Sequence, residues 1–222
     1  MAILTFPCAL PSVSIICNSF VLEKNSDQVQ TDGCEEQEVI RGPSFWHATY
    51  STPILYGADF TTMSAWLESI KNPPQYFWAW DTKSRYPFAY RGTGFTGLVR
   101  AGGGGFDGTC TLASVGSDSV SLGLSGLPVG FTLGPEDRLS FPWDTSRQAL
   151  HKIVSPAAAA DGSGNLTVEV RGITNPIYAP GATVTLSQAC FKAYLRKGTD
   201  KGPRDDQGYG KFSFEAMQTL RQ

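Results

Sequence analysis

One segment of the chain has the hydrophobic spacing of an amphipathic helix. Apolar residues recur there at intervals of three and four, which gathers their side chains on one helical face. They are Phe60, Met63, Trp66, Leu67 and Ile70. Asp59 is the expected N-cap, and Asn72, which precedes Pro73, is the expected end, because a residue before proline avoids the α region. The pattern predicts a helix near residues 59–72 whose apolar face covers a sheet.

Most of the remaining pattern is typical of strands. Residues 45–52 and 75–81 flank the helix and are rich in aromatic side chains, which favour strands. The polar stretch 23–38 is expected to be a hairpin or a surface loop. Further strands are expected within 109–124 and at 138–141, 166–170, 182–186, 189–195 and 211–217. These elements predict a mostly β protein.

A change in composition divides the chain. From Arg91 onward the sequence is rich in glycine and alternates apolar residues with Ser, Thr and Gly. The last expected strand, 211–217, can return to the sheet of the first module. We therefore predict a first β module with one flanking helix, formed by residues 1–90 and 196–222, and a second β module inserted as residues 91–195.

Composition excludes several classes of function. The 222 residues include 18 Lys and Arg against 20 Asp and Glu, a net charge of −2, so the basic footprint of a nucleic-acid-binding protein is absent. No stretch reaches the roughly 18 consecutive apolar residues of a membrane span. Residues 6–21 lack a basic n-region and contain two prolines, so we interpret them as mature protein.

The cysteines do not suggest a metal site. There are five, they are widely spaced, and no two form a CxxC pair: Cys8, Cys17, Cys34, Cys110 and Cys190. Such a set is typical of free thiols in a reducing compartment.

No group of residues has the pattern of a catalytic site. The tetraglycine 102–105 lacks the Lys-Ser or Lys-Thr of a phosphate loop, so a flexible β connection is favoured. His47 lies in an expected strand and His151 in a connecting segment, and neither has a sequence-local partner. The paired acids are expected to be solvated: Glu136 with Asp137, and Asp205 with Asp206. The sequence predicts no enzyme, no cofactor and no metal, and we assign no catalytic, cofactor-binding or metal-binding residue.

The tryptophans leave one binding function open. A row of exposed indoles can stack on sugar rings, and Trp80 and Trp143 are the better candidates for the surface, whereas Trp46 and Trp66 are expected in the core. Core or interface packing is the favoured interpretation.

An ordered series of short motifs resembles the distal tail proteins of long-tailed bacteriophages. The series comprises Phe6-Pro7, Leu10-Pro11, the polar hairpin, Arg41-Gly42-Pro43 before Trp46, the helix with Trp66 and Leu67, and Tyr76-Phe77-Trp78. It continues through Gly123-Leu124, Leu127-Pro128, Leu133 to Asp137, and Leu166-Thr167-Val168 with Pro176. The cysteines and the tetraglycine have no counterpart in that pattern.

The resemblance implies that the first module is a β-sandwich flanked by a helix. It further implies a virion structural protein that forms a homo-oligomeric ring, commonly a hexamer, between the tail tube and the tail tip or baseplate. Its expected partners are further copies of itself, the tail tube protein and tail hub or tip proteins, with no nucleic acid and no membrane. Its expected location is the virion tail, after assembly in the host cytoplasm. Two alternatives stay open: a tail-tube or tail-completion subunit, and a carbohydrate-binding receptor-recognition module.

Overall fold

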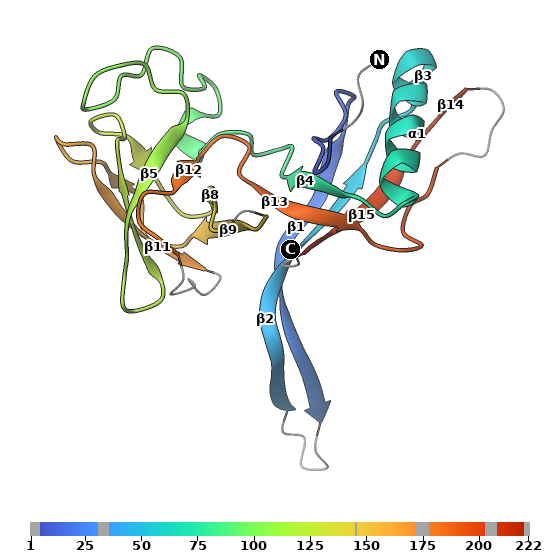
Figure 1. Ribbon diagram of the computed structural model, residues 1–222, viewed down its shortest axis with the longest axis horizontal. Coiled ribbons are helices and arrows are strands. Elements are labelled where there is room, and N and C mark those ends of the chain that lie inside the picture. Colours follow the sequence, from blue (N-terminus) through green and yellow to red (C-terminus); the bar gives the residue numbers. More distant parts are fainter. Residues whose placement is uncertain (1–4, 31–35, 145, 172–177, 203–207, 220–222) are drawn as a thin grey trace. The chain divides into compact units, whose positions relative to one another are not determined.

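The computed structural model describes residues 5–30, 36–144, 146–171, 178–202 and 208–219. It confirms a mostly β protein with one α-helix (Figure 1). The described residues divide into two compact units: those within 1–77 and 193–219 form unit 1, and those within 78–192 form unit 2. The boundaries between the units were predicted at 90/91 and 195/196, whereas the structure places them at 77/78 and 192/193.

Unit 1 is built around one five-stranded sheet. Its strands are β1 (Ile16–Gln30), β2 (Glu36–Ser51), β4 (Tyr76–Trp80), β13 (Cys190–Leu195) and β15 (Ser213–Gln218). Strands β4 and β13 cross the unit boundaries, so residues 78–80 and 190–192 are counted with unit 2. The five strands lie in the order β1-β2-β15-β13-β4, so the C-terminal strand β15 inserts between β2 and β13. This confirms that the last strand returns to the sheet of the first module. A short ribbon pairs β3 (Leu55–Tyr56) with β14 (Tyr209–Gly210).

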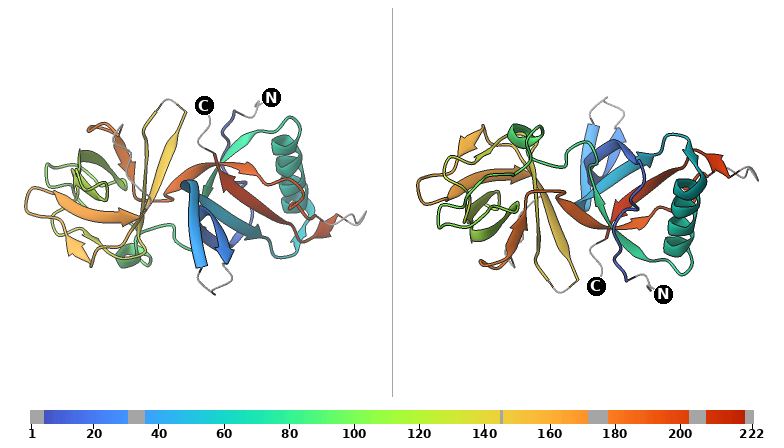
Figure 2. Two further views of the ribbon diagram at one scale, coloured as in Figure 1. Left: turned by 90° about the horizontal axis from the view of Figure 1, so that it is seen from below. Right: turned by 90° about the horizontal axis from the view of Figure 1, so that it is seen from above.

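Helix α1 (Gly57–Lys71) covers one face of this sheet (Figure 2). Met63, Trp66, Leu67 and Ile70 are buried, as the periodicity predicts, and the helix ends at Asn72. The predicted N-cap is wrong, because the helix begins two residues earlier and its N-cap is Tyr56. Asp59 instead lies in the first turn, where a carboxylate interacts favourably with the helix dipole.

Aromatic side chains join the helix to the sheet. Trp66 lies 5.1 Å from Phe77 of β4 and 5.5 Å from Phe214 of β15, measured between ring centroids. The indole Nε1 of Trp66 donates a hydrogen bond to the carbonyl of Ala9 at 3.0 Å. β-Strand side chains alternate between the two faces of a sheet. The residues next to Phe77 in β4 and next to Phe214 in β15 therefore point to the face opposite the helix.

Unit 2 is a closed antiparallel barrel. Its strands are β5 (Thr109–Val115), β6 (Ser121–Ser125), β8 (Arg138–Pro142), β9 (Gln148–Ile153), β11 (Leu166–Arg171) and β12 (Thr183–Thr185), in the order β11-β6-β5-β12-β8-β9. A ribbon of β7 (Thr132–Leu133) and β10 (Ala158–Ala159) and a 3₁₀ turn, η1 (Phe88–Tyr90), complete it. Closure pairs every barrel strand on both sides and leaves no open edge.

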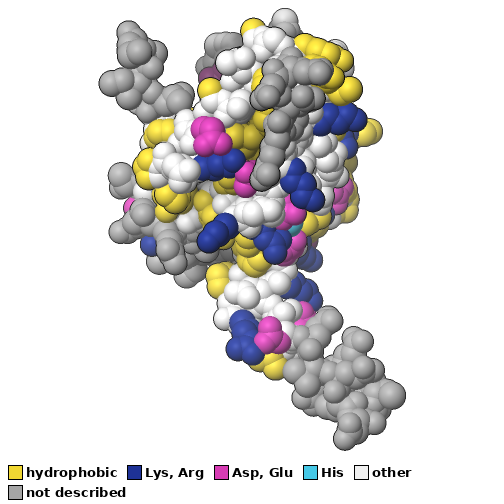
Figure 3. Space-filling view, turned by 90° about the vertical axis from the view of Figure 1, so that its right-hand side faces the viewer, with side chains coloured by type: hydrophobic (Ala, Val, Ile, Leu, Met, Phe, Trp, Pro, Cys, Tyr) yellow, Lys and Arg dark blue, Asp and Glu magenta, His cyan; other side chains and the backbone are white. Residues whose placement is uncertain are grey.

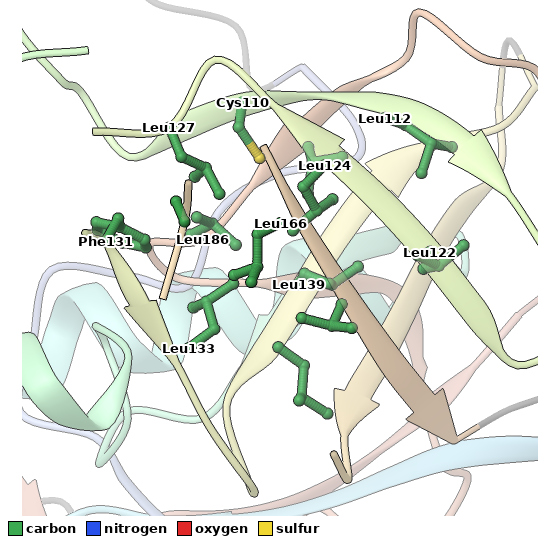
Figure 4. Close-up of a cluster of buried hydrophobic side chains, with 14 of the residues drawn as sticks. Cys110, Leu112, Leu122, Leu124, Leu127, Phe131, Leu133, Leu139, Leu166 and Leu186 are labelled. Atoms are coloured by element: carbon green, nitrogen blue, oxygen red, sulfur yellow. The ribbon is translucent and has the colours of Figure 1, made fainter. Parts of the chain in front are cut away.

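The barrel is filled by its own apolar core (Figure 4). In β11, Leu166, Val168 and Val170 are buried while the residues between them are exposed, the alternation expected of a strand with one face in a core. Tyr90 of η1 stacks on Phe131 at 4.5 Å. This packing explains why residues 78–90, predicted to belong to the first module, lie in unit 2.

Candidate assembly interface

Strand β1 is a long terminal strand of an open sheet. It pairs with β2 from Ile16↔Ser51 to Gln30↔Glu36, and the described part of the chain supplies no strand on its other side. The outer backbone N–H and C=O groups of a terminal strand are available to a strand of another chain. At the other end of the sheet, Cys8 bridges Phe77, and the amide of Cys8 donates to the carbonyl of Tyr76 at 3.2 Å.

The distal halves of β1 and β2 form a two-stranded arm. Strand β15 pairs with β2 only from Ser213↔Ser51 to Met217↔His47, so β2 has a single neighbour beyond His47. We call residues 24–30 and 36–45 the arm. Figure 1 shows it extending away from the rest of its sheet. A two-stranded ribbon has little stability of its own in water, so an arm of this length is suited to contact with another surface.

Apolar and charged side chains alternate on the arm and its root. Ile40 is 76% exposed and Val39 54%, and Val21 of β1 is 42% exposed. Across the arm, Lys24 pairs with Glu38 at 3.1 Å, and Arg41 pairs with Asp27. The space-filling view shows basic and acidic side chains interspersed with apolar ones (Figure 3). A mixed surface of this kind fits a protein partner better than a polyanion.

The pairing is irregular where the arm begins. Register shifts occur between Glu23 and Asn25 and between Asn25 and Ser26, and the opposite strand contains Gly42 and Pro43. Bulges disrupt the ladder locally and bend the strand, and proline donates no backbone hydrogen bond. The root of the arm is therefore weakly held by the main chain.

Side chains reinforce this root. The amide of Trp46 donates to the side-chain oxygen of Gln218 at 3.0 Å, one residue beyond the last β2–β15 pair. Next to it, His47 lies between two carboxylates: Nδ1 is 2.7 Å from Glu23 of β1, and Nε2 is 3.2 Å from Glu215 of β15. Glu215 also accepts a hydrogen bond from Arg196 at 2.9 Å. These four side chains, the His47 cluster, connect β1, β2, β15 and the end of β13.

The geometry of the His47 cluster is not that of a metal centre. The two carboxylates contact opposite nitrogens of one imidazole, so a single ion cannot bind both carboxylates and the ring together. Among the described residues, no group of three or more His, Cys, Asp or Glu side chains could hold a metal ion. The cluster was missed in the sequence analysis because 24 and 168 residues separate His47 from its partners. Only the sheet order brings them together.

The other histidine lies in the barrel. His151 belongs to β9, a strand that the sequence analysis interpreted as a connecting segment, and its side chain is 3% exposed. Its ring lies 5.7 Å from those of Phe141 and Tyr178. This supports a structural role for His151.

Of the two paired acids that the structure describes, Glu136 is solvated as predicted and Asp137 is not. Glu136 is exposed and pairs with Lys152 at 2.8 Å. The prediction for Asp137 is wrong, because its side chain is buried at 2% exposure. Its two oxygens accept backbone hydrogen bonds from Phe88 at 2.7 Å and Gly134 at 2.9 Å, so it joins η1 to the turn before β8. Asp205 and Asp206 lie outside the described residues.

The tetraglycine forms a tight turn and no phosphate cradle. The amide of Arg100 donates to the carbonyl of Gly104 at 2.9 Å, and Val99 bridges Gly105. Gly103 and Gly104 have φ near +88°, a conformation that favours glycine. No helix follows this turn, since the next element is strand β5.

Cys8, Cys110 and Cys190 are free thiols, as predicted. The Sγ of Cys17 donates a hydrogen bond to the carbonyl of Ser19 at 3.2 Å. Cys34 and Pro176 lie outside the described residues. Burial raises the pKa of Cys110 to about 12 and that of Cys190 to about 11. Neither thiol has the depressed pKa of a nucleophile.

The tryptophans do not form an exposed row. Trp46 and Trp66 are buried, as predicted. Trp80 and Trp143 are both half-buried, and Trp143 packs against Tyr178 and Arg147. Packing within the protein therefore explains the position of the Trp143 indole, and no sugar ligand is needed to explain it.

A groove lies beside α1 in unit 1. It has a volume of about 460 Å³, and Leu67 and Phe212 supply its apolar lining. Lys71 pairs with Asp200 across it, and this contact raises the pKa of Lys71. With Glu68 and Lys201 the lining carries two acids and two bases, so its charge favours neither an anion nor a cation.

Comparison with known proteins adds no relative. Neither the known protein-family models nor the curated protein sequences contain a match to this chain. Within the described residues, no helix is both long and apolar enough to span a bilayer.

Proposed function

We propose that this protein is a structural subunit of a bacteriophage tail, assembled as a homo-oligomeric ring that joins the tail tube to the tail tip or baseplate. The observation that carries the proposal is the open β1 edge continued by an arm with exposed apolar side chains. Such a surface fits a protein neighbour. The motif series that resembles distal tail proteins supplies the phage context.

Ring closure gives these surfaces a physical role. In a ring, each subunit presents one surface to the next subunit and a different surface to the previous one. The β1 edge and the arm supply one such surface, and the barrel of unit 2, which has no open edge, is free to contact tail-tip proteins. The tail tube, the hub or tip proteins and further copies of this chain are the proposed partners, and the role proposed for the protein is non-enzymatic.

The mass of the purified protein tests this proposal. Light scattering is measured over a range of protein concentrations, and negative-stain images are taken of the same fractions. We expect a closed ring with a central channel. Open-ended filaments would favour the tail-tube alternative. A monomer at every concentration, including after mixing with the tail tube protein, would contradict the ring.

A matched pair of variants locates the interface. Ile40→Asp places a charge on the arm, and Val99→Asp places one on an apolar residue of unit 2 that is 58% exposed. We expect Ile40→Asp to shift the mass to that of the monomer and Val99→Asp to leave the ring intact, because burying an unpaired charge costs several kcal/mol. Loss of the ring in both variants, or in neither, would contradict an interface at the arm.

A further inference from the structure

The His47 cluster can change its hydrogen bonding with protonation. Glu23 and Glu215 are both acceptors when ionised, and they approach opposite ring nitrogens of His47 at 2.7 and 3.2 Å. Only the imidazolium, which carries a proton on each nitrogen, donates to both. In the neutral ring one nitrogen presents a lone pair, so one carboxylate faces another acceptor and that bond is lost. Whichever nitrogen keeps the proton, the connection across the three strands is broken.

The place of this cluster in the fold gives the change a consequence. His47 is the last residue of β2 that pairs with β15, and Glu23 immediately precedes the first register shift of the arm. The main chain is weakest at this point, because the bulges interrupt the β1–β2 ladder. The side chain of His47 therefore bonds the root of the arm to the rest of the sheet at a point where few main-chain hydrogen bonds make that connection.

We propose that protonated His47 locks the root of the arm to the sheet and that loss of its proton releases the arm. The titratable or charged side chains on this face of the neighbouring strands include Glu23 of β1, Glu215 of β15, and Lys192, Tyr194 and Arg196 in or just after β13. The Arg196–Glu215 contact of 2.9 Å does not involve the ring proton, so the change falls on the imidazole. The inference is independent of the proposed function, because it concerns the arm within one chain.

The direction of the pH effect follows from the bonds. The stabilising contact exists while the ring carries a proton on each nitrogen and disappears when one proton is lost. The arm is thus locked at lower pH and loosened at higher pH.

Amide hydrogen exchange tests the proposal on the full chain. Protection factors, corrected for intrinsic exchange, are measured for peptides of the arm at about pH 5.5 and about pH 8, and the mass of every sample is determined in parallel. We expect protection of the arm in the wild type to fall roughly tenfold at the higher pH, the size of one hydrogen bond to a charged group. Barrel peptides serve as the internal reference.

Three variants distinguish the effect of the His47 proton from other effects of pH on the arm. His47→Arg keeps a permanent cation with several donors and is expected to protect the arm at both pH values. His47→Gln, which stays neutral, is expected to give the low protection at both. The control Lys24→Gln removes the Lys24–Glu38 pair within the arm and should keep the pH response.

Two results would overturn the lock. One is equal protection of the wild-type arm at both pH values in samples of equal mass. The other is a full pH response in folded His47→Gln. Neither result depends on ring formation, which the mass reports separately.

Discussion

At the scale of single residues, Asp137 shows how a charged side chain can be a fixed part of the core of unit 2. Asp137→Ala leaves two backbone N–H groups without their acceptors, and a buried unsatisfied group costs about 1–3 kcal/mol. We expect the free energy of unfolding to fall by about 3 kcal/mol, as measured by denaturant unfolding. The neighbouring Glu136→Ala is the control and should change stability by less than about 0.5 kcal/mol. Equal effects of the two variants would contradict the structural role of Asp137.

The buried thiols give a prediction about alkaline pH. Burial raises the pKa of Cys110 from 9.0 to about 12, so the unfolded chain releases this proton at lower pH than the folded chain. Stability is therefore complete below about pH 9 and is lost as pH rises toward the folded pKa. We expect Cys110→Val, which has no proton to lose, to show a smaller decline in melting temperature between about pH 8 and about pH 11. An identical decline in both proteins would rule out this thiol as a cause.

The same burial protects the thiols from chemistry. At about pH 8 the folded protein is expected to leave Cys110 and Cys190 unmodified by a thiol reagent, because the thiolate is the reactive form. Both should react once denaturant unfolds the chain. Mass spectrometry of labelled peptides measures the outcome. Rapid labelling of Cys110 in the native protein would contradict the packing of the barrel, and rapid labelling of Cys190 would contradict its raised pKa.

At the scale of elements, Trp66 joins α1 to its sheet by packing and by one hydrogen bond. Trp66→Phe keeps an aromatic ring against Phe77 and Phe214 but leaves the Ala9 carbonyl without its donor, an expected loss of about 1 kcal/mol. Trp66→Ala also empties the site of the ring, for an expected loss of about 3–5 kcal/mol. Thermal unfolding measures both. A Phe variant as unstable as the Ala variant would show that the hydrogen bond, and not the ring, dominates.

The elements also show what local sequence could predict. The helix stripe and most strands followed from spacing, because burial on one face imposes a period that the sequence displays. The helix start was predicted two residues late, since no side chain caps it. Strand β9 was missed because His151 and Lys152 interrupt its apolar character, although His151 is buried in the barrel. Neither face of the arm is covered within unit 1, and the adjacent residues Val39 and Ile40 are both exposed. The arm therefore has no core-facing alternation to detect.

Contacts distant in sequence account for the rest. The buried position of Asp137 depends on Phe88, 49 residues away, and the His47 cluster depends on β15 inserting beside β2. No local pattern contains either relationship. The sequence therefore predicted the second half of β2, a hairpin or loop over 23–38 and the return of the last strand. It predicted neither the long strand β1 nor the side chains that fix the root of the arm.

At the scale of the whole molecule, the two units differ in whether the backbone hydrogen-bonding groups of their outer strands are paired. The sheet of unit 1 is open at β1, whereas the barrel of unit 2 is closed and has its own core. A chain segment with a closed hydrogen-bonded sheet and a separate apolar core meets the physical requirements of an independent folding unit. We therefore predict that residues 78–192, expressed alone, fold and unfold in one cooperative transition.

A substitution inside the barrel makes this prediction sharp. Leu122 of β6 is fully buried in the barrel core, and Leu122→Ala is expected to cost about 2–5 kcal/mol. If the barrel folds autonomously, this loss should be the same, within about 0.5 kcal/mol, in the isolated segment and in the corresponding transition of the full chain. Calorimetry measures both. Two results would contradict autonomous folding: an isolated segment without a cooperative transition, and a Leu122→Ala effect confined to the full chain. Either would mean that the barrel needs unit 1 to fold and that the two units form one cooperative structure.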